Sequence, residues 1–151
     1  SNDIPSAMLL AERQIGKDRA AAIKTYEQVL TKTPDNFVVL NNLAYLAFED
    51  KNLTRAEELA KKAVSLQREN ADAVDTLAQI YVAKGDKAAA LKLYEEVSAR
   101  PIANDDVYLN HVSVLLELDK KALASRKLAS REFKSEAAKQ RAESLKQQYG
   151  L

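Results

Sequence analysis

The fold is decided by residues 71–101, which read ADAVDTLAQIYVAKGDKAAALKLYEEVSARP. Before Gly85, the apolar residues recur at the spacing of one helix face: Val74, Leu77, Ala78 and Tyr81. After Gly85, a second stripe recurs at the same spacing and stops before Pro101: Ala90, Leu93, Tyr94 and Val97. Glycine readily adopts the left-handed backbone that ends a helix. The stretch therefore predicts two short amphipathic helices joined by a tight turn.

The same pattern returns along the chain with a 34-residue period. Small residues mark one ladder: Ala22, Ala56, Ala90 and Ala124. Leucines mark a second ladder: Leu9, Leu43 and Leu77. Polar turn residues mark a third: Asp18, Asn52 and Asp86. A two-helix unit of this length buries its apolar face only by stacking on its neighbours. The sequence therefore predicts an all-α fold, a right-handed α-solenoid of stacked helix-turn-helix units with a C-terminal capping helix.

The repeat divides the chain into unequal parts. We expect one solenoid domain over 1–151, with a partial or divergent repeat at 3–36, repeats at 37–70 and 71–104, a divergent repeat at 105–134 and a capping helix at 135–151. In the 37–70 repeat, Thr54 followed by Glu57 fits a capping box and predicts the start of the second helix. In the 105–134 repeat, Arg131 stands where the earlier repeats carry Val or Ala.

Both ends of the pattern leave alternatives open. Leu10 stands where later repeats place a small residue, which fits either a one-residue register shift or a frayed half-repeat. Ser135 can cap a last helix, but no Gly or Pro interrupts 121–149, so one continuous helix is also possible. The chain begins Ser-Asn without Met, which is consistent with a piece of a longer protein.

Charge is distributed unevenly along the chain. From Lys120 to the end, nine basic and three acidic residues give a net charge of +6. The whole chain carries +1, so the first 119 residues carry −5. A basic end on an acidic body could meet an acidic partner, a phosphate-rich surface or the acidic groove of a neighbouring copy, whereas a solvated helical face explains the same charges without a partner. Few aromatic residues interleave the basic ones, so no nucleic acid is expected as a ligand.

The sequence offers little material for catalysis. It has no Cys, which excludes a disulfide, a thiolate metal site and a cysteine nucleophile. The single histidine, His111, falls in the same position as Leu43 and Leu77, so we interpret it as a core residue rather than a general base or metal ligand. We expect no enzyme activity, no cofactor and no metal. The longest apolar stretch, residues 37–48, is too short to insert into a membrane.

These repeats resemble the tetratricopeptide repeat family. Residues 74–101 match the family's signature. In order, this signature is a large residue, Leu, a small residue, an aromatic, a turn Gly, a small residue, an aromatic, a small residue and Pro. The departures are Val74 at the first position, which is aromatic in the family, Lys51 where the next repeat has Gly85, and Pro101 one step early. The resemblance covers nearly the whole chain and implies a protein–protein interaction module.

The family binds extended peptides or helices in a concave groove lined by the first helix of each repeat. Carried over by position, the resemblance implies these groove residues: Asn41, Asn42, Tyr45, Phe48, Glu49, Asp72, Asp75, Gln79, Asp106 and Asn110. Some members clamp a carboxylate with Lys and Arg in these positions, and the Asn, Asp and Thr found here argue against such a clamp. The acidic residues predict a preference for a neutral or basic segment.

Two questions stay open at this point. Tyr45 and Phe48 are either peptide anchors or ordinary surface and core-edge residues. The chain is either a binding module or a structural spacer of a longer solenoid that self-associates head to tail as a homo-oligomer. More loosely, the alanine-rich repeats resemble those of bacterial lipoproteins of the PEP-CTERM or exopolysaccharide-associated type. That resemblance favours a periplasmic or outer-membrane-associated location over a cytoplasmic one.

Overall fold

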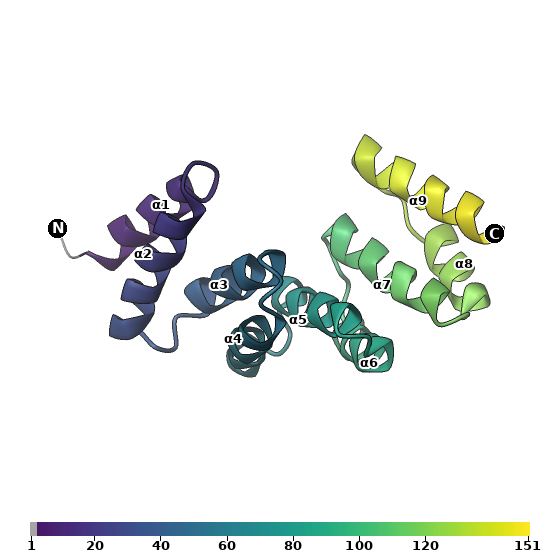
Figure 1. The fold of residues 1–151 in the computed structure, drawn as a ribbon. Coiled ribbons are helices and arrows are strands. Elements are labelled where there is room, and N and C mark those ends of the chain that lie inside the picture. Colours follow the sequence, from purple (N-terminus) through teal and green to yellow (C-terminus); the bar gives the residue numbers. More distant parts are fainter. Residues whose placement is uncertain (1–2) are drawn as a thin grey trace. The chain divides into compact units, whose positions relative to one another are not determined.

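The computed structural model describes residues 3–151, and these residues form nine α-helices and no strand. In chain order the helices are α1 (Ile4–Ile15), α2 (Arg19–Lys32), α3 (Phe37–Glu49), α4 (Leu53–Leu66), α5 (Ala71–Ala83), α6 (Lys87–Val97), α7 (Asp105–Glu117), α8 (Lys121–Ala129) and α9 (Glu136–Tyr149). They are paired as helical hairpins, with α1 on α2, α3 on α4, α5 on α6 and α7 on α8 (Figure 1). The predicted all-α helical repeat fold is confirmed.

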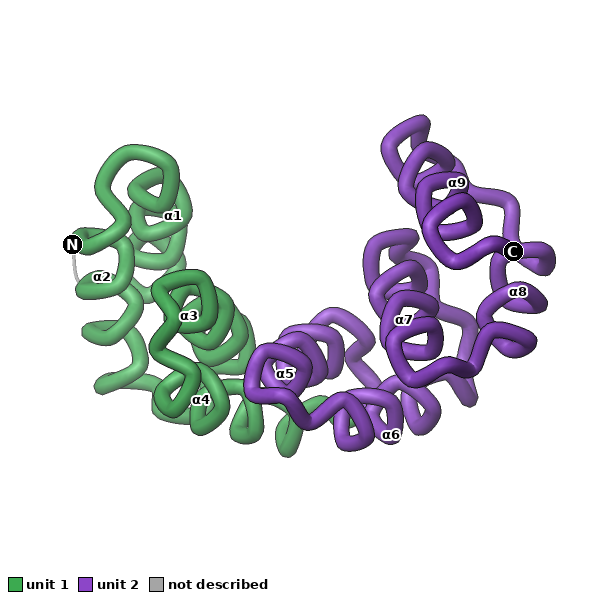
Figure 2. Tube along the Cα trace, turned by 45° about the vertical axis from the view of Figure 1, so that its right-hand side comes forward, with its two compact units in different colours: residues 1–68 green, residues 69–151 purple. Residues whose placement is uncertain are grey.

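The chain forms two compact units, residues 1–68 and residues 69–151 (Figure 2). In unit 1, α3 packs on both α2 and α4. In unit 2, α7 packs on α5, α6, α8 and α9. Each unit therefore contains its own stacked hairpins.

The 34-residue period sets the helix boundaries directly. The second helix of each hairpin begins at one repeated position: Arg19, Leu53, Lys87 and Lys121. The first helix of each hairpin ends at another: Ile15, Glu49, Ala83 and Glu117. The alanine ladder Ala22, Ala56, Ala90 and Ala124 is fully buried, at 0% exposure in every repeat. Because these alanines are fully buried, a longer side chain at any of them would have to displace its packed neighbours.

Polar residues just before the helices explain where the helices start. Asn36, Asn70 and Asn104 cap α3, α5 and α7, each accepting a hydrogen bond from a backbone N–H of the first turn. Asn52 caps α4 by accepting from the Arg55 N–H. The predicted start at Thr54 is therefore wrong, because Asn52 supplies the cap and Thr54 lies inside the first turn.

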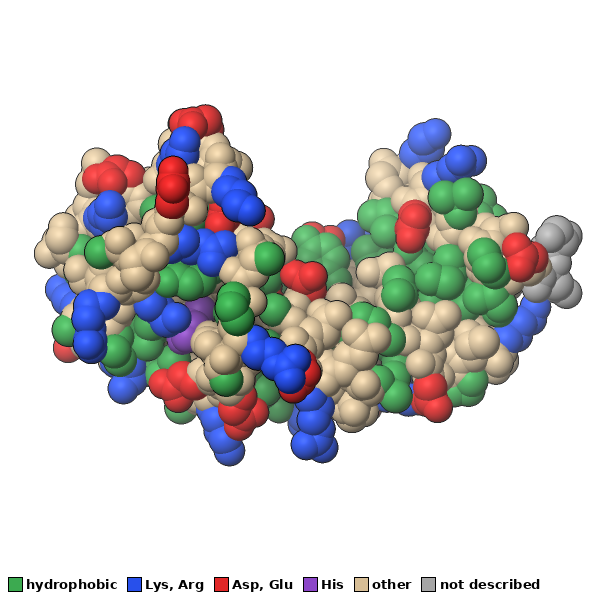
Figure 3. All heavy atoms as spheres, turned by 180° about the vertical axis from the view of Figure 1, so that it is seen from behind, with side chains coloured by type: hydrophobic (Ala, Val, Ile, Leu, Met, Phe, Trp, Pro, Cys, Tyr) green, Lys and Arg blue, Asp and Glu red, His purple; other side chains and the backbone are tan. Residues whose placement is uncertain are grey.

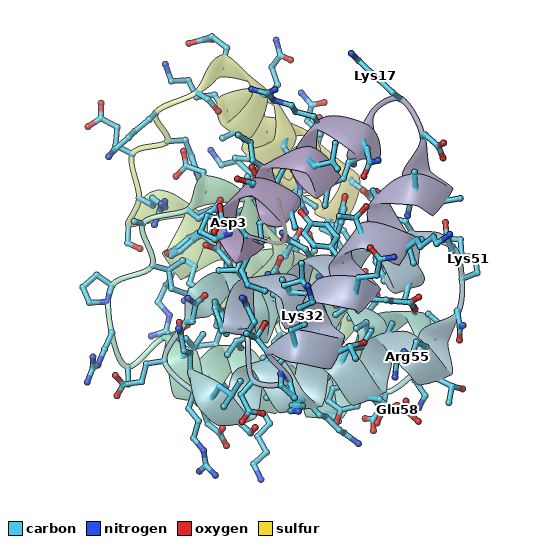
Figure 4. The ribbon with its side chains drawn as sticks, turned by 90° about the vertical axis from the view of Figure 1, so that its left-hand side faces the viewer. Asp3, Lys17, Lys32, Lys51, Arg55 and Glu58 are labelled. Carbon is cyan, nitrogen blue, oxygen red and sulfur yellow. The ribbon has the colours of Figure 1, made fainter. Side chains whose placement is uncertain are left out.

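The turns inside the hairpins need a left-handed residue. Lys51, Gly85 and Asp119 recur with the 34-residue period and have φ of 62°, 86° and 58°. In each case the next residue donates its N–H to a carbonyl five residues back, which closes the end of the helix at 2.8–2.9 Å. The first hairpin turns differently, since Lys17, at the corresponding position, does not have a positive φ. The next residue, Asp18, donates its N–H to the Gln14 carbonyl, four residues back, at 2.7 Å. The lysines at these turns, Lys17 and Lys51, are labelled in Figure 4.

The first helix is shifted by one residue relative to the repeat. Ala11 is fully buried, whereas Leu9 and Leu10 are 49% and 51% exposed. Ala11 takes the small-residue position that Ala44 holds in the next repeat, at a separation one short of the full period. The placement of Leu9 in the buried leucine ladder is therefore wrong, and a register shift accounts for the first hairpin.

The last hairpin breaks its pattern at Arg131. Helix α8 ends at Ala129, and Ser135 caps α9, so 121–149 is not one continuous helix. The Arg131 guanidinium donates to Asp105 at 2.6 Å and to the Ile102 carbonyl at 2.6 Å. An arginine in this position binds the start of α7 instead of extending α8.

The alanine ladder predicts a position-specific cost of enlargement. Ala90→Leu should lower the free energy of unfolding by about 1–3 kcal/mol, because it forces two packed helices apart. Ala88→Leu is the matched control, since Ala88 is exposed on the same helix. Urea melts followed by circular dichroism measure both, and equal stability of the two variants would contradict the assignment of Ala90 to a helix contact.

At the left-handed turns, introducing a glycine and removing one should change the stability of the chain in opposite directions. Asp119→Gly should stabilise the chain by up to about 1 kcal/mol, because a non-glycine residue is strained at this φ. Gly85→Ala should destabilise by about 1–2 kcal/mol. A Cβ at Gly85 would meet nothing within 4 Å, so the backbone alone decides this cost. Thermal melts of the two single variants provide the measurement, and the same direction of change in both would refute it.

Candidate functional site

The candidate groove residues of unit 2 lie on α5 and α7. Helix α7 packs between α5 and α9, so residues of the three helices can share one surface (Figure 2). Asp72, Asp75 and Gln79 come from α5, and Asp106 and Asn110 come from α7. The structure brings Asp75, Gln79 and Asn110 into one hydrogen-bonded cluster.

Tyr94 of α6 lies at the centre of this cluster. Its hydroxyl donates to Asp75 Oδ1 at 2.5 Å and accepts from Gln79 Nε2 at 2.8 Å. Asn110 Nδ2 contacts both oxygens of Asp75, at 3.0 and 3.1 Å. Three donors thus converge on or next to one carboxylate, and their arrangement joins α5, α6 and α7.

Arg141 of α9 extends the cluster to a fourth helix. Its Nη2 donates to Asn110 Oδ1 at 2.6 Å, and its Nη1 lies 3.8 Å from Asp106 Oδ1. We call the connected residues the polar network: Asp75, Gln79, Tyr94, Asn110 and Arg141. Sequence reasoning missed Tyr94 and Arg141 because it placed the tyrosine in the core and the arginine on a solvated helix.

Burial controls the charge of the polar network. Burial raises the pKa of Asp75, against the effect of hydrogen bonds from Tyr94 and Asn110, which lower it. Burial also raises the pKa of Tyr94, and the neighbouring Asp75 carboxylate raises it further. The tyrosine is therefore a neutral donor at any physiological pH. The polar groups of the network mostly form hydrogen bonds with one another, so the network is a fixed part of this face.

The exposed carboxylates at the beginning of α5 and α7 are better placed to meet a partner. Asp72 is exposed and accepts a hydrogen bond from Asn104 Nδ2 at 3.0 Å. The Asp106 side chain is 80% exposed. Both lie in the first turn of their helices. This end of the face is acidic and open to solvent.

Unit 1 carries a simpler version of the same arrangement. Asn42 Nδ2 donates to the Tyr26 hydroxyl at 3.0 Å, with the same 16-residue separation as Tyr94 and Asn110. Asn41, in the position of Asp75, has a buried Oδ1 without a hydrogen-bond partner. The position of Tyr94 is Ala60 in this repeat, so no tyrosine hydroxyl is available to it.

The remaining candidates of unit 1 gather around Arg19. Its guanidinium pairs with Glu49 at 2.6 Å and with Asp50 at 2.8 Å. Arg19, and then a hydrogen bond from Tyr45, lower the pKa of Glu49. Tyr45 is 50% exposed, whereas Phe48 is half-buried. Glu49 is therefore already paired, and Tyr45 is the more accessible of the two aromatic residues.

A separate cleft of about 270 Å³ lies between α1 and α2. Its lining includes one acidic and one basic residue, Asp3 and Lys32, both labelled in Figure 4. Leu10 and Val29 contribute apolar surface. None of the candidate groove residues lines this cleft. The Asp3 carboxylate already caps α1 by accepting from the Ser6 N–H at 3.2 Å.

His111 is a core residue, as its position in the repeat predicts. It is 2% exposed and stacks on the Tyr94 ring with centroids 5.1 Å apart. Its Nδ1 lies 3.2 Å from Ser98 Oγ. Burial, and then the nearby Lys127, lower the pKa of His111 to about 4. The imidazole is therefore neutral near pH 7 and supports packing of α6 on α7.

Within residues 3–151, no group of three or more His, Cys, Asp or Glu side chains is placed to hold a metal ion. The same residues include no helix with the length and apolar character needed to cross a bilayer.

The fold and its polar faces are those of a helical-hairpin repeat protein. The family model described as tetratricopeptide repeat matches residues 47–108. Residues 47–108 therefore match tetratricopeptide repeats, the family that the sequence resembles. Repeats of this family generally mediate protein–protein interactions and are typically non-catalytic. No protein in the curated comparison matches the sequence.

Solved structures share the fold at low sequence identity. A tetratricopeptide repeat protein from Parabacteroides merdae has 18% identity and a TM-score of 0.78, over 97% of this chain and 60% of its own. The first TPR of Spaghetti (RPAP3), bound to the HSP90 peptide SRMEEVD, has 21% identity and a TM-score of 0.69, over 77% and 95%. A Thermobaculum terrenum O-GlcNAc transferase mutant has 22% identity and a TM-score of 0.69, over 74% of this chain and only 22% of the transferase.

The buried histidine predicts acid sensitivity of unit 2. An ordinary histidine has a pKa near 6.5, so His111 binds a proton below about pH 6.5 in the unfolded chain. In the folded chain it binds this proton only near pH 4. Stability should therefore be fully present above about pH 6.5 and fall by about 3 kcal/mol as the pH drops to about 4. His111→Leu, which restores the residue of the preceding repeats, should remove this part of the fall.

Urea melts of both proteins between pH 4 and 7 measure the difference. Asp105→Asn is a suitable control, because Arg131 lowers the pKa of Asp105 and its contribution is lost only below its ordinary pKa of 3.8. Parallel pH profiles for the parent chain and His111→Leu would show that His111 is not responsible.

Proposed function

We propose that this chain is a non-catalytic protein-interaction module that holds a peptide or a helix on the faces of its first helices. The observation that carries this proposal is the open acidic end of the α5–α7 face. Asp72 and Asp106 are exposed there, beside the fixed polar network. We propose that this face prefers a neutral or basic segment, since Lys or Arg side chains could pair with these carboxylates.

Tyr45 is our candidate anchor in unit 1. It is half exposed, and its hydroxyl interacts with Glu49. A tyrosine held in this way offers contact area with little loss of side-chain freedom on binding. Asn41 and Asn42 lie one turn earlier on the same helix, where amide groups could contact a bound backbone. Phe48 belongs to the edge of the core in this proposal.

A binding screen tests the acidic face. Peptide arrays that vary Lys, Arg, Asp and Glu should enrich neutral or basic sequences, and a selected basic peptide is then measured by fluorescence anisotropy. Asp72→Asn combined with Asp106→Asn should weaken its binding by about three- to tenfold, since an exposed ion pair contributes about 0.2–1 kcal/mol. Tyr45→Ala in the same assay tests the anchor.

The control for charge is Glu95→Gln combined with Glu96→Gln. These residues are exposed on the second helix α6, and the variant changes the net charge by the same amount. Equal loss in both double variants would mean that the peptide follows net charge and not this face. Enrichment of acidic peptides would overturn the proposed preference.

The uneven charge of the chain supports a second candidate function. A basic segment of +6 from Lys120 onward and an acidic remainder of −5 could pair between copies, as in a structural spacer that assembles head to tail. Sedimentation of the same samples separates the two functions. Self-association that disappears at high salt supports assembly, and a monomer that binds peptide supports the interaction module.

A further inference from the structure

A small pocket lies at the junction of α2, α3 and α4 in unit 1, with a volume of about 150 Å³. Its apolar lining is Ile23, Leu43, Ala47 and Leu59, and its polar lining is Glu27, Asp50, Asn52 and Arg55. Leu43 and Leu59 are buried, whereas the four polar residues are exposed. The pocket therefore has an apolar floor and a polar rim that is open to solvent.

The repeat explains why this junction is hollow. Ala47 lines the pocket, and the residues one and two periods later are Tyr81 and Leu115. Leu115 is buried in the core of unit 2. The 37–70 repeat thus has a methyl group where the following repeats have a large side chain. A dry cavity of about 150 Å³ can hold the six carbon atoms of benzene, so this pocket has room for a leucine side chain.

The pocket is separate from the candidate groove. None of the candidate groove residues lines it. On α3, Ala47 is two residues from Tyr45, and successive residues are about 100° apart around a helix axis. The two side chains therefore leave α3 on nearly opposite sides, and an occupant of the pocket would not cover Tyr45.

The rim of the pocket favours a positively charged neighbour for the occupant. Asp50 pairs with Arg19 at 2.8 Å. Arg55 pairs with Glu58 at 3.4 Å, and both are labelled in Figure 4. Across residues 3–151, no ion pair within 4.0 Å involves Glu27. Glu27 is therefore the carboxylate at this rim that a cation from outside could pair with.

Helix α8 of unit 2 presents an apolar side chain with the matching charge. Leu123 is 41% exposed, and α8 contains basic residues and no acidic residue. Arg126 follows Leu123 by three residues, so the two side chains lie on the same side of α8. Arg126 is exposed and, within residues 3–151, forms no ion pair within 4.0 Å. In the space-filling view from behind, basic side chains in blue and hydrophobic ones in green are interspersed around the purple histidine of unit 2 (Figure 3).

Other exposed apolar residues lack this combination. Leu9, Leu10 and Ile15 share α1 with an acidic residue, Leu66 shares α4 with two, and Val38 and Tyr45 lie on α3, which has no basic residue. Among the exposed large apolar residues on these helices, Leu123 is therefore the one that lies on a purely basic helix. Its charge complements the unpaired carboxylate of the pocket.

We propose that the pocket binds Leu123 from α8 of a second copy of this chain, with Arg126 of that copy paired with Glu27. Leu123 would be buried against the apolar floor, and the ion pair would fix its orientation at the rim. The two sides of the contact are different surfaces, so the contact is heterologous and can repeat from copy to copy. It supplies the contact for the head-to-tail assembly proposed above, and it rests on that proposed function.

Sedimentation velocity over a range of protein concentrations at low salt tests this contact. The parent chain should self-associate. Leu123→Ser, and Ala47→Leu, which fills the pocket from within, should each weaken association by about tenfold or more, because a leucine is no longer buried between copies. Leu66→Ser is the control and should change nothing, since Leu66 is 43% exposed but does not line the pocket.

A mixture of two variants tests whether the contact is heterologous. The Leu123→Ser chain keeps an open pocket, and the Ala47→Leu chain keeps Leu123. Each should be monomeric alone, whereas their equimolar mixture should form a dimer that grows no further. A mixture that stays monomeric would overturn the proposal.

Charge reversal tests the pair at the rim. Glu27→Lys should weaken association, and Glu27→Lys combined with Arg126→Glu should restore it. No recovery in the double variant would overturn the pairing of these residues. Both residues are exposed, so these variants should stay folded, which circular dichroism checks. If Ala47→Leu does not fold, the charge reversal and Leu123→Ser still decide.

The same measurements separate this contact from the assembly function on which it rests. A parent chain that is monomeric at every concentration would overturn both. Salt-sensitive self-association that Leu123→Ser and Glu27→Lys leave unchanged would overturn this contact alone. Peptide binding plays no part in these readouts.

Discussion

The close approach of paired helices at a methyl-sized side chain is the contact on which the rest of this structure depends. Ala22, Ala56, Ala90 and Ala124 are completely buried at this contact, one in each hairpin. Because the contact returns with the 34-residue period, the helix ends return with it. Larger residues such as Tyr26 and Tyr94 can then fill the space beside the contact, with their hydroxyl groups directed to polar partners.

Much of the fold could be predicted because it depends on local chemistry and period. The left-handed turn at Gly85 and the serine cap at position 135 each act within a few residues of the chain. The prediction failed at Thr54 because an earlier residue, Asn52, competes for the same cap. It failed at Leu9 because one residue of slippage moves a helix face by about 100°.

The candidate site could be predicted only in part, for a physical reason. Family position gave Asp75, Gln79 and Asn110 as groove residues, and this assignment stays a prediction; the structure shows that they belong to one polar network. The sequence does not show that Tyr94 and Arg141 reach them, since those contacts span 19 and 31 residues and depend on side-chain direction. The 16-residue separation shared by Tyr26 with Asn42 and by Tyr94 with Asn110 was the available signal.

The polar network also constrains which substitutions this sequence tolerates at its positions. Loss of the Tyr94 hydroxyl alone would remove one hydrogen bond to the Asp75 carboxylate and leave only those from Asn110. Loss of Asp75 alone would leave the hydroxyl and the Asn110 amide without this acceptor. Substitutions here are tolerated best when they occur together. In the 37–70 repeat, Asn41 and Ala60 stand at the positions of Asp75 and Tyr94, and Asn41 Oδ1 is buried without a hydrogen-bond partner. In related sequences, these positions should covary across helices while neighbouring surface positions change independently.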